Sequence, residues 1–111
     1  MGYSRAVVKG HWCFVSGVTG YDYATMQMPE AAAAQARNCF ATIWRVLDEA
    51  DFSPEDIVRV QYTVTGADLV DEIAPVLGEW LGEIRPAATM VVAGLIRPEM
   101  KVEVEVTAMR G

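Results

Sequence analysis

The chain has 111 residues, 52% of them hydrophobic and 22% charged, with a net charge of −6 at pH 7. This composition is typical of one globular domain over residues 1–111 and excludes an intrinsically disordered chain. Because a negative surface repels phosphate backbones, we expect no nucleic acid as the main partner. No apolar run of about 18 residues and no secretory leader is found, so we expect no membrane contact and a cytoplasmic location.

The chain opens with two short strands. Residues 5–9 and 12–16 have strand composition, and Gly10 and His11 form the turn between them. Residues 17–29 then read as a loop punctuated by glycines. Four large side chains of this loop either line an apolar pocket or pack on the helix that follows: Tyr21, Tyr23, Met26 and Met28.

A long helix is predicted over residues 30–50. Pro29 suits the first helical position, and Glu30 complements the positive end of the helix dipole. Apolar residues then recur at a spacing of three to four, which gives the helix one buried stripe. These residues are Ala33, Ala36, Phe40, Ile43, Trp44 and Leu47.

A capped turn and an alternating strand come next. Ser53 is a suitable N-cap, with Asp56 three residues on, as in a capping box. Residues 57–65 alternate between apolar and polar side chains, as a strand with one buried face does. The predicted buried set is Val58, Val60, Tyr62 and Val64.

The last third predicts a helix and two strands. The helix spans residues 68–82, with Asp68 as its cap and Gly82 at its end. Pro75 conflicts with an uninterrupted helix, so we expect a kink or a late start. Residues 88–95 and 101–109 are the remaining strands.

The element order ββαβαββ predicts an α+β fold, a sheet with two helices on one face. The last strand would turn Val102, Val104 and Val106 towards the helices. Residues 12–16 and 88–95 are apolar on both faces, whereas a sheet with one solvated face alternates throughout. We therefore expect another subunit to cover part of the second face.

Few side chains suggest chemistry. The thiols of Cys13 and Cys39 are interpreted as buried and structural, and His11 as a surface residue, so no metal or cofactor is expected. Glu103 and Glu105 lie two apart on the face opposite the helices. Either a partner subunit partly desolvates one carboxylate, which raises its pKa and suits proton transfer, or both are solvated or paired with arginines.

Four segments together resemble the Rid family, also called YjgF. They are "YSRAV…VSG", "AQARNCFATIWRVLDEAD", "IRPAATMVVAGL" and "KVEVEVTAM", and they extend over nearly the whole chain. The resemblance implies a chorismate-mutase-like fold and a homotrimer with small-molecule sites in clefts between subunits. It also implies hydrolysis of imines or enamines to ketones and ammonia without a cofactor.

The resemblance carries site residues onto this chain one by one. The family's cleft tyrosine corresponds to Tyr3, and its serine and glycine at the end of the second strand correspond to Ser16 and Gly17. The glutamate that positions water corresponds to Glu103. The residue next to Ala88 in the same cleft is Thr89.

Two family residues are replaced. The arginine that grips the substrate carboxylate follows a Pro-Ala pair, but here Ala88 follows that pair, and a cleft asparagine of the second helix is replaced near Ala74. Arg97 or Arg5 is a candidate substitute, or the ligand lacks a carboxylate. Two hypotheses therefore stand, an imine or enamine deaminase and a non-catalytic binding or regulatory module. The acidic charge argues against the ribonuclease activity described for some members.

Overall fold

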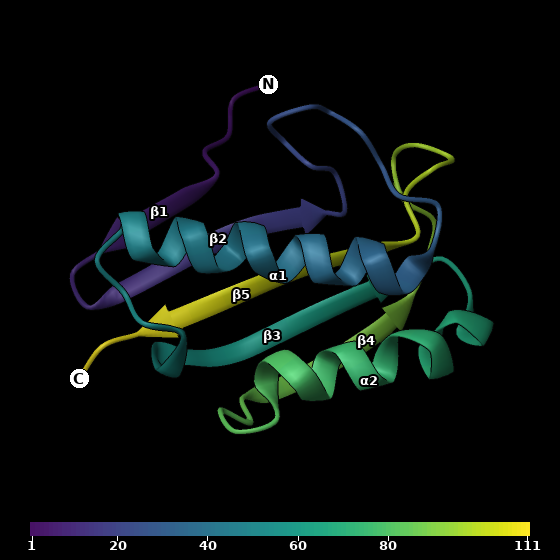
Figure 1. Ribbon diagram of the computed structural model, residues 1–111. Coiled ribbons are helices and arrows are strands. Elements are labelled where there is room, and N and C mark those ends of the chain that lie inside the picture. Colours follow the sequence, from purple (N-terminus) through teal and green to yellow (C-terminus); the bar gives the residue numbers. More distant parts are fainter.

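The computed structural model describes residues 1–111 as a five-stranded sheet with two helices on one face (Figure 1). The element order and the α+β class predicted from the sequence are confirmed. The strands are β1 (Ala6–Lys9), β2 (Trp12–Thr19), β3 (Ile57–Val64), β4 (Ala87–Val92) and β5 (Val102–Met109). The helices are α1 (Ala32–Glu49) and α2 (Val70–Leu81), with short 3₁₀ turns η1 (Pro54–Asp56) and η2 (Ala67–Leu69).

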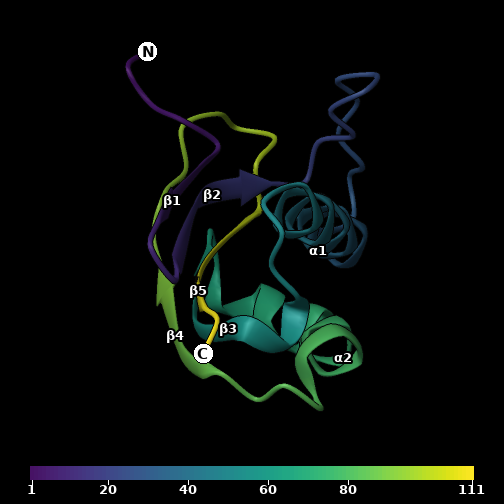
Figure 2. The ribbon, with the colours of Figure 1, turned by 90° about the vertical axis from the view of Figure 1, so that its left-hand side faces the viewer.

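The strands lie in the order β1-β2-β5-β3-β4. Every neighbouring pair is antiparallel except β3 and β4, which are parallel. Parallel strands need a crossover connection, and α2 supplies it between β3 and β4. Figure 2 shows the result from the side, with the sheet in one layer and both helices in the other. No helix is long and apolar enough to cross a membrane.

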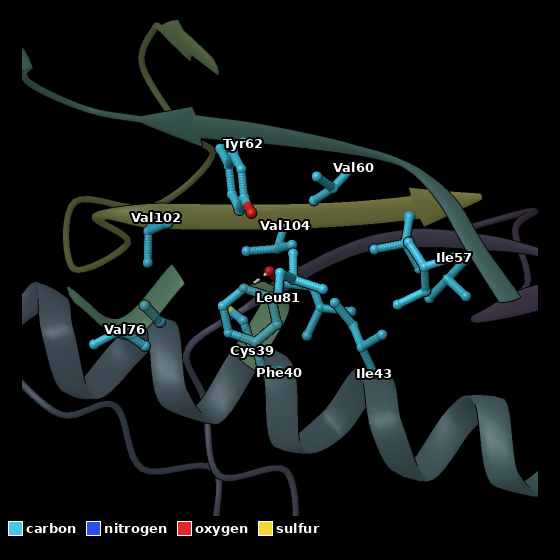
Figure 3. Close-up of a cluster of buried hydrophobic side chains, with 14 of the residues drawn as sticks. Cys39, Phe40, Ile43, Ile57, Val60, Tyr62, Val76, Leu81, Val102 and Val104 are labelled. Atoms are coloured by element: carbon cyan, nitrogen blue, oxygen red, sulfur yellow. Dashed lines mark hydrogen bonds between the residues drawn. The ribbon is translucent and has the colours of Figure 1, made fainter. Parts of the chain in front are cut away.

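The core fills the space between the two layers (Figure 3). The last strand buries Val102, Val104 and Val106 against the helices, as its alternation predicts. Both cysteine thiols are buried and free, which agrees with their interpretation as structural thiols. From the helices, the largest buried apolar side chains are Phe40, Ile43, Leu47, Ile73 and Val76.

Both helices begin later than the sequence suggests. The first starts at Ala32, so Pro29 and Glu30 precede it and its first turn holds no acidic residue. A carboxylate from the other helix takes that role, because Glu72 accepts a hydrogen bond from the backbone N–H of Ala33 at 3.0 Å. A long-range contact therefore replaces the local cap, which no pattern within one helix predicts.

The second helix begins at Val70, two residues later than predicted, but it does not begin at Pro75. Asp68 lies in the 3₁₀ turn rather than at the cap, and the α-helix begins at Val70 without a side-chain cap. Pro75 lies inside the helix, which loses one backbone hydrogen bond there. The predicted end is confirmed, since the helix ends at Leu81 with Gly82 as C-cap.

Two β-bulges change the predicted strand faces. In β3 the register shifts between Ile57 and Arg59, so Val58 is exposed and Ile57 is buried in its place. In β2 the register shifts between Val15 and Val18, and the strand runs to Thr19 rather than to residue 16. A bulge inserts one extra residue and reverses the side-chain alternation beyond it, which the alternation alone does not reveal. The fourth strand is also shorter than predicted, Ala87–Val92 instead of 88–95.

Candidate functional site

The two candidate carboxylates lie on the sheet face opposite the helices, called the open face below. Their neighbours on β5 are buried under the helices, so Glu103 and Glu105 must point the other way. Glu103 is partly buried and lies opposite Thr19 of β2 and Thr63 of β3. Glu105 is exposed. Both lie on the same central strand, so partial burial distinguishes Glu103 from its neighbour.

The bulge in β2 brings Gly17 directly against Glu103. A Cβ atom on Gly17 would lie 2.6 Å from both Cδ and Oε1 of Glu103. Only a residue without a side chain lets the carboxyl group lie this close to the strand. Bulges next to functional sites re-aim side chains in this way. The structure thus brings together two of the residues carried over from the family resemblance.

Arg5 completes this group of residues. Its Nη1 donates hydrogen bonds to the carbonyl oxygens of Gly17 at 2.9 Å and of Ser16 at 3.2 Å. Its guanidinium lies over the ring of Tyr23, 5.5 Å from the ring centroid. The Ser16 hydroxyl donates to the carbonyl oxygen of Ser4 at 2.5 Å, which ties the N-terminal segment to the bulge.

The electrostatics of this group favour proton transfer. Burial raises the pKa of Glu103 above the ordinary glutamate value, and the charge of Glu105 raises it further, while Arg5 acts in the opposite direction. A carboxylate with a raised pKa accepts a proton more readily near neutral pH. This desolvation arises within the single chain, whereas the alternative from the sequence attributed it to a partner subunit.

Two other predicted residues lie elsewhere in the chain. Ala88 is exposed and pairs with Val60 on β3, which in turn pairs with Val106 on β5. Position 88 is therefore two strand spacings away from Val106, and Val106 is three residues along β5 from Glu103. Together these offsets separate position 88 from Glu103 by roughly 14 Å. Thr89 accepts a hydrogen bond from Nη2 of Arg59 at 3.3 Å.

The remaining candidates are also outside the Glu103 group. Tyr3 is exposed on the N-terminal segment, and Ala74 is exposed on α2. Arg97 lies in the loop before β5, close to Glu99, whose carboxylate accepts a hydrogen bond from the Tyr21 hydroxyl. Of the two arginines considered as substitutes, only Arg5 therefore contacts the site.

Sequence reasoning missed two polar contacts. The hydroxyl of Tyr23 lies 3.3 Å from the hydroxyl of Thr19, so this loop tyrosine packs beside the site and does not line a separate pocket. Arg59 reaches Thr89 on the neighbouring strand, and both lie on the open face. The alternation of residues 57–65 does place Arg59 on that face, but the register with β4 comes only from the folded sheet.

The open face also carries an apolar patch, formed by Val7, Trp12, Phe14 and Met109. These four side chains lie on the three adjacent strands β1, β2 and β5 and are 40–47% exposed. The rings of Trp12 and Phe14 are stacked, with centroids 6.1 Å apart. Contiguous exposed apolar side chains of this kind mark surfaces that other molecules cover.

Comparisons with known proteins agree over the whole chain. The family model described as endoribonuclease L-PSP matches residues 1–110. A RutC family protein from Leuconostoc mesenteroides subsp. cremoris is 32% identical over 113 residues, which cover 97% of this chain and 87% of that protein.

Solved structures support the same relationship. Rv2704 from Mycobacterium tuberculosis, of the YjgF/YER057c/UK114 family, is 34% identical with a TM-score of 0.88, over 98% of this chain and 87% of that one. RidA from the Antarctic bacterium Psychrobacter sp. PAMC 21119 is 28% identical with a TM-score of 0.92, over 99% and 89%. The YjgF-like arrangement of one mixed sheet and two helices, expected from the resemblance, is thereby confirmed.

Proposed function

Since this chain belongs to the endoribonuclease L-PSP family, with the RutC, YjgF and Rid proteins, we propose that it hydrolyses a small imine or enamine at the Glu103 group. One observation carries the proposal. A glutamate with a raised pKa lies against Gly17, beside an arginine that two backbone carbonyl oxygens hold in place. No cofactor enters the reaction, because water is the only co-reactant that the hydrolysis needs.

The proposed reaction uses Glu103 for every proton transfer. The carboxylate accepts a proton from water while the water oxygen bonds to the imine carbon and the C=N π electrons move to nitrogen. Glu103 returns that proton to the nitrogen, which gives a neutral carbinolamine. The carboxylate then takes the hydroxyl proton and passes it to the nitrogen as the C=O bond forms and the C–N bond breaks, which releases the ketone and ammonia. Positioned acid–base groups of this kind contribute about 10²–10⁴-fold to a rate.

Arg5 is the proposed ligand-holding residue. Both of its hydrogen bonds use Nη1, so the edge formed by Nε and Nη2 donates to no protein atom. That edge has the fork geometry that binds a carboxylate through two parallel hydrogen bonds. Arg5 would therefore supply, beside Glu103, the anion contact that Ala88 lacks.

We further propose a homotrimer whose clefts assemble the site from two subunits. The separation of roughly 14 Å between position 88 and Glu103 is too long for both to contact one small molecule within a single chain. A partner subunit would bring its own Ala88, Thr89 and Tyr3 to the Glu103 group. The exposed patch around Trp12 and Phe14 supports an oligomer, because it leaves apolar surface for a partner to bury.

The first test is imine hydrolysis by the purified protein. An amino-acid oxidase generates 2-imino acids, and semicarbazide reports how much imine remains. We expect Glu103→Gln to lower kcat by about 10²-fold or more. Arg5→Gln should mainly raise KM for imines that carry a carboxylate, whereas the loop variant Arg97→Gln should behave as the wild type.

A non-catalytic binding or regulatory module is the alternative, and the alanine at position 88 favours it. In that case the wild type clears no imine, and Glu103→Gln changes ligand affinity only. Ala88→Arg separates the two proposals further. If the wild type is inert and Ala88→Arg gains activity, the cleft is intact and lacks only an anion contact. The search for the natural ligand would then move to uncharged or bulkier molecules.

A further inference from the structure

A hollow lies on the side of the molecule opposite the Glu103 group, between the C-terminal ends of the two helices. Its volume is about 640 Å³, within the usual range for small-molecule sites. Trp44 of α1, Trp80 of α2 and Pro54 of η1 contribute to its lining. It has no residue in common with the Glu103 group, from which the sheet separates it. We call it the helix-end groove.

Aromatic rings form one side of the helix-end groove. Trp44 and Trp80 meet edge to face, with centroids 5.3 Å apart, and Phe40 stacks on Trp80 at 5.7 Å. The Trp80 indole nitrogen Nε1 is buried without a hydrogen-bond partner, and no other buried side-chain nitrogen or oxygen lacks one. An unpaired buried donor is uncommon, and only an acceptor such as a water oxygen can satisfy it.

Gly78 opens the groove on the side of α2. A Cβ atom at this position would meet nothing within 4 Å. Glycine inside a helix costs about 1 kcal/mol relative to alanine, and neither a left-handed backbone nor close packing requires it here. The glycine therefore leaves space in the groove without a structural reason inside the chain.

The polar lining of the groove is negative. Its charged residues are Glu55, Glu79 and Glu83, and no lysine or arginine lines it. One ion pair touches the rim, Arg37 with Glu79 at 3.8 Å, and both side chains are more than half exposed. Arg37 offsets only one of the three carboxylate charges, so the groove remains negative.

The helix ends add to this negative charge. The carbonyl groups at the C-terminus of a helix carry the negative end of its dipole, and cations stabilise that end. Neither α1 nor α2 has a basic residue in its last turn. Three or more histidine, cysteine or acidic side chains in metal-binding proximity are found nowhere in the chain. A diffuse organic cation thus fits the groove better than a metal ion.

We propose that the helix-end groove binds a small organic ammonium ion. The faces of Trp44 and Trp80 attract the cation through their π electrons, for which tryptophan is the strongest of the aromatic residues. Glu79 and Glu83 supply the opposite charge at the rim. This site does not depend on the proposed activity at Glu103, and a second ligand there would leave the open face free.

The test uses choline and its neutral isostere 3,3-dimethyl-1-butanol. The indole N–H signals of the three tryptophans are followed by NMR at constant ionic strength. We expect saturable shifts of the Trp44 and Trp80 signals with choline and at least tenfold weaker binding of the alcohol. Trp12, on the open face, serves as the internal control and should not respond.

Matched charge variants complete the experiment. Glu79→Gln/Glu83→Gln should weaken choline binding at least fivefold, while Glu30→Gln/Asp71→Asn, which removes the same charge far from the groove, should not. Equal binding of the neutral alcohol, shifts that do not saturate, or equal losses in both double variants would overturn the proposal. Saturation by Mg²⁺ at lower concentration than by choline would also overturn it, in favour of a metal site. Circular dichroism verifies that each variant is folded.

Discussion

The two faces of the sheet differ in almost every property. The helix-covered face is sealed by apolar side chains, and Thr19 and Gln35 are the only polar side chains buried in the chain. The open face carries both carboxylates of β5, the guanidinium groups of Arg5 and Arg59, and the patch around Phe14. The same strands build both faces, so alternate residues of one strand serve stability and chemistry separately.

This difference shows which departures from a pattern are informative. Burial in the core is enough to explain an apolar side chain that points towards the helices. An apolar ring on the open face, or a carboxylate partly buried beside a glycine, costs free energy unless something uses it. The candidate site and the candidate interface are therefore both found where the alternation of a solvated strand breaks down.

Truncating one phenylalanine on each face tests the comparison most directly. Phe40→Ala removes a ring that is fully buried under the helices, so we expect the free energy of unfolding to fall by about 3–5 kcal/mol. Phe14→Ala should leave the isolated chain folded and reduce the mass of the assembly. Urea unfolding of dilute protein and sedimentation velocity measure the two effects. Equal destabilisation of the monomer by both variants would contradict the distinction.

Substituting Gln35 should have the next largest effect on stability, because Gln35 is a polar side chain buried on the helix-covered face of the sheet. Its Nε2 donates to the carbonyl oxygens of Pro29 and Glu99, and its Oε1 accepts from the N–H of Lys101. Gln35→Leu keeps the volume but leaves these three backbone groups unpaired, so we expect a loss of about 2–4 kcal/mol. Hydrogen exchange at the Lys101 amide should accelerate, and unchanged protection would show that the hydrogen bond does not hold this loop.

A methyl group at position 17 tests the close contact on the open face. Gly17→Ala would place a Cβ atom 2.6 Å from the carboxyl of Glu103 and push it outwards. Because the contact is with the far end of a flexible side chain, we expect little loss of stability but a fall of the Glu103 pKa towards its ordinary value, read by NMR titration. Gly94→Ala is the control, since its added Cβ meets nothing within 4 Å. An unchanged Glu103 pKa would mean that Gly17 does not position the carboxylate.

The smallest effect is the pH dependence of stability from Glu103. Its pKa is raised in the folded chain, so its contribution is fully present below the ordinary value of about 4.3 and is lost as the pH rises through the folded pKa. Glu103→Gln carries no charge at any pH. The variant should therefore gain thermal stability relative to the wild type as the pH rises above about 4.3. A difference in stability between the variant and the wild type that stays constant with pH would count against a desolvated carboxylate.

The sequence predicted the helices and strands well, and their exact ends less well. The apolar stripe of α1 and the alternation of β5 each lie within one element, so the periodicity of the chain reveals them. The ends of the helices and the bulges depend on partners from elsewhere. Glu72 caps α1 from α2, and the shift at Val58 follows from pairing with β5.

By itself, the sequence determined the fold class, the sealed face and the position of Glu103 opposite it, because side-chain periodicity follows from local backbone geometry. It also has alanine at position 88, where the family resemblance implies an arginine. Only the tertiary structure decided that Arg5, rather than Arg97, lies beside Glu103, and that Gly17 makes room for its carboxylate. It alone revealed the helix-end groove, since the two helix ends are separated in sequence and meet only when the chain folds.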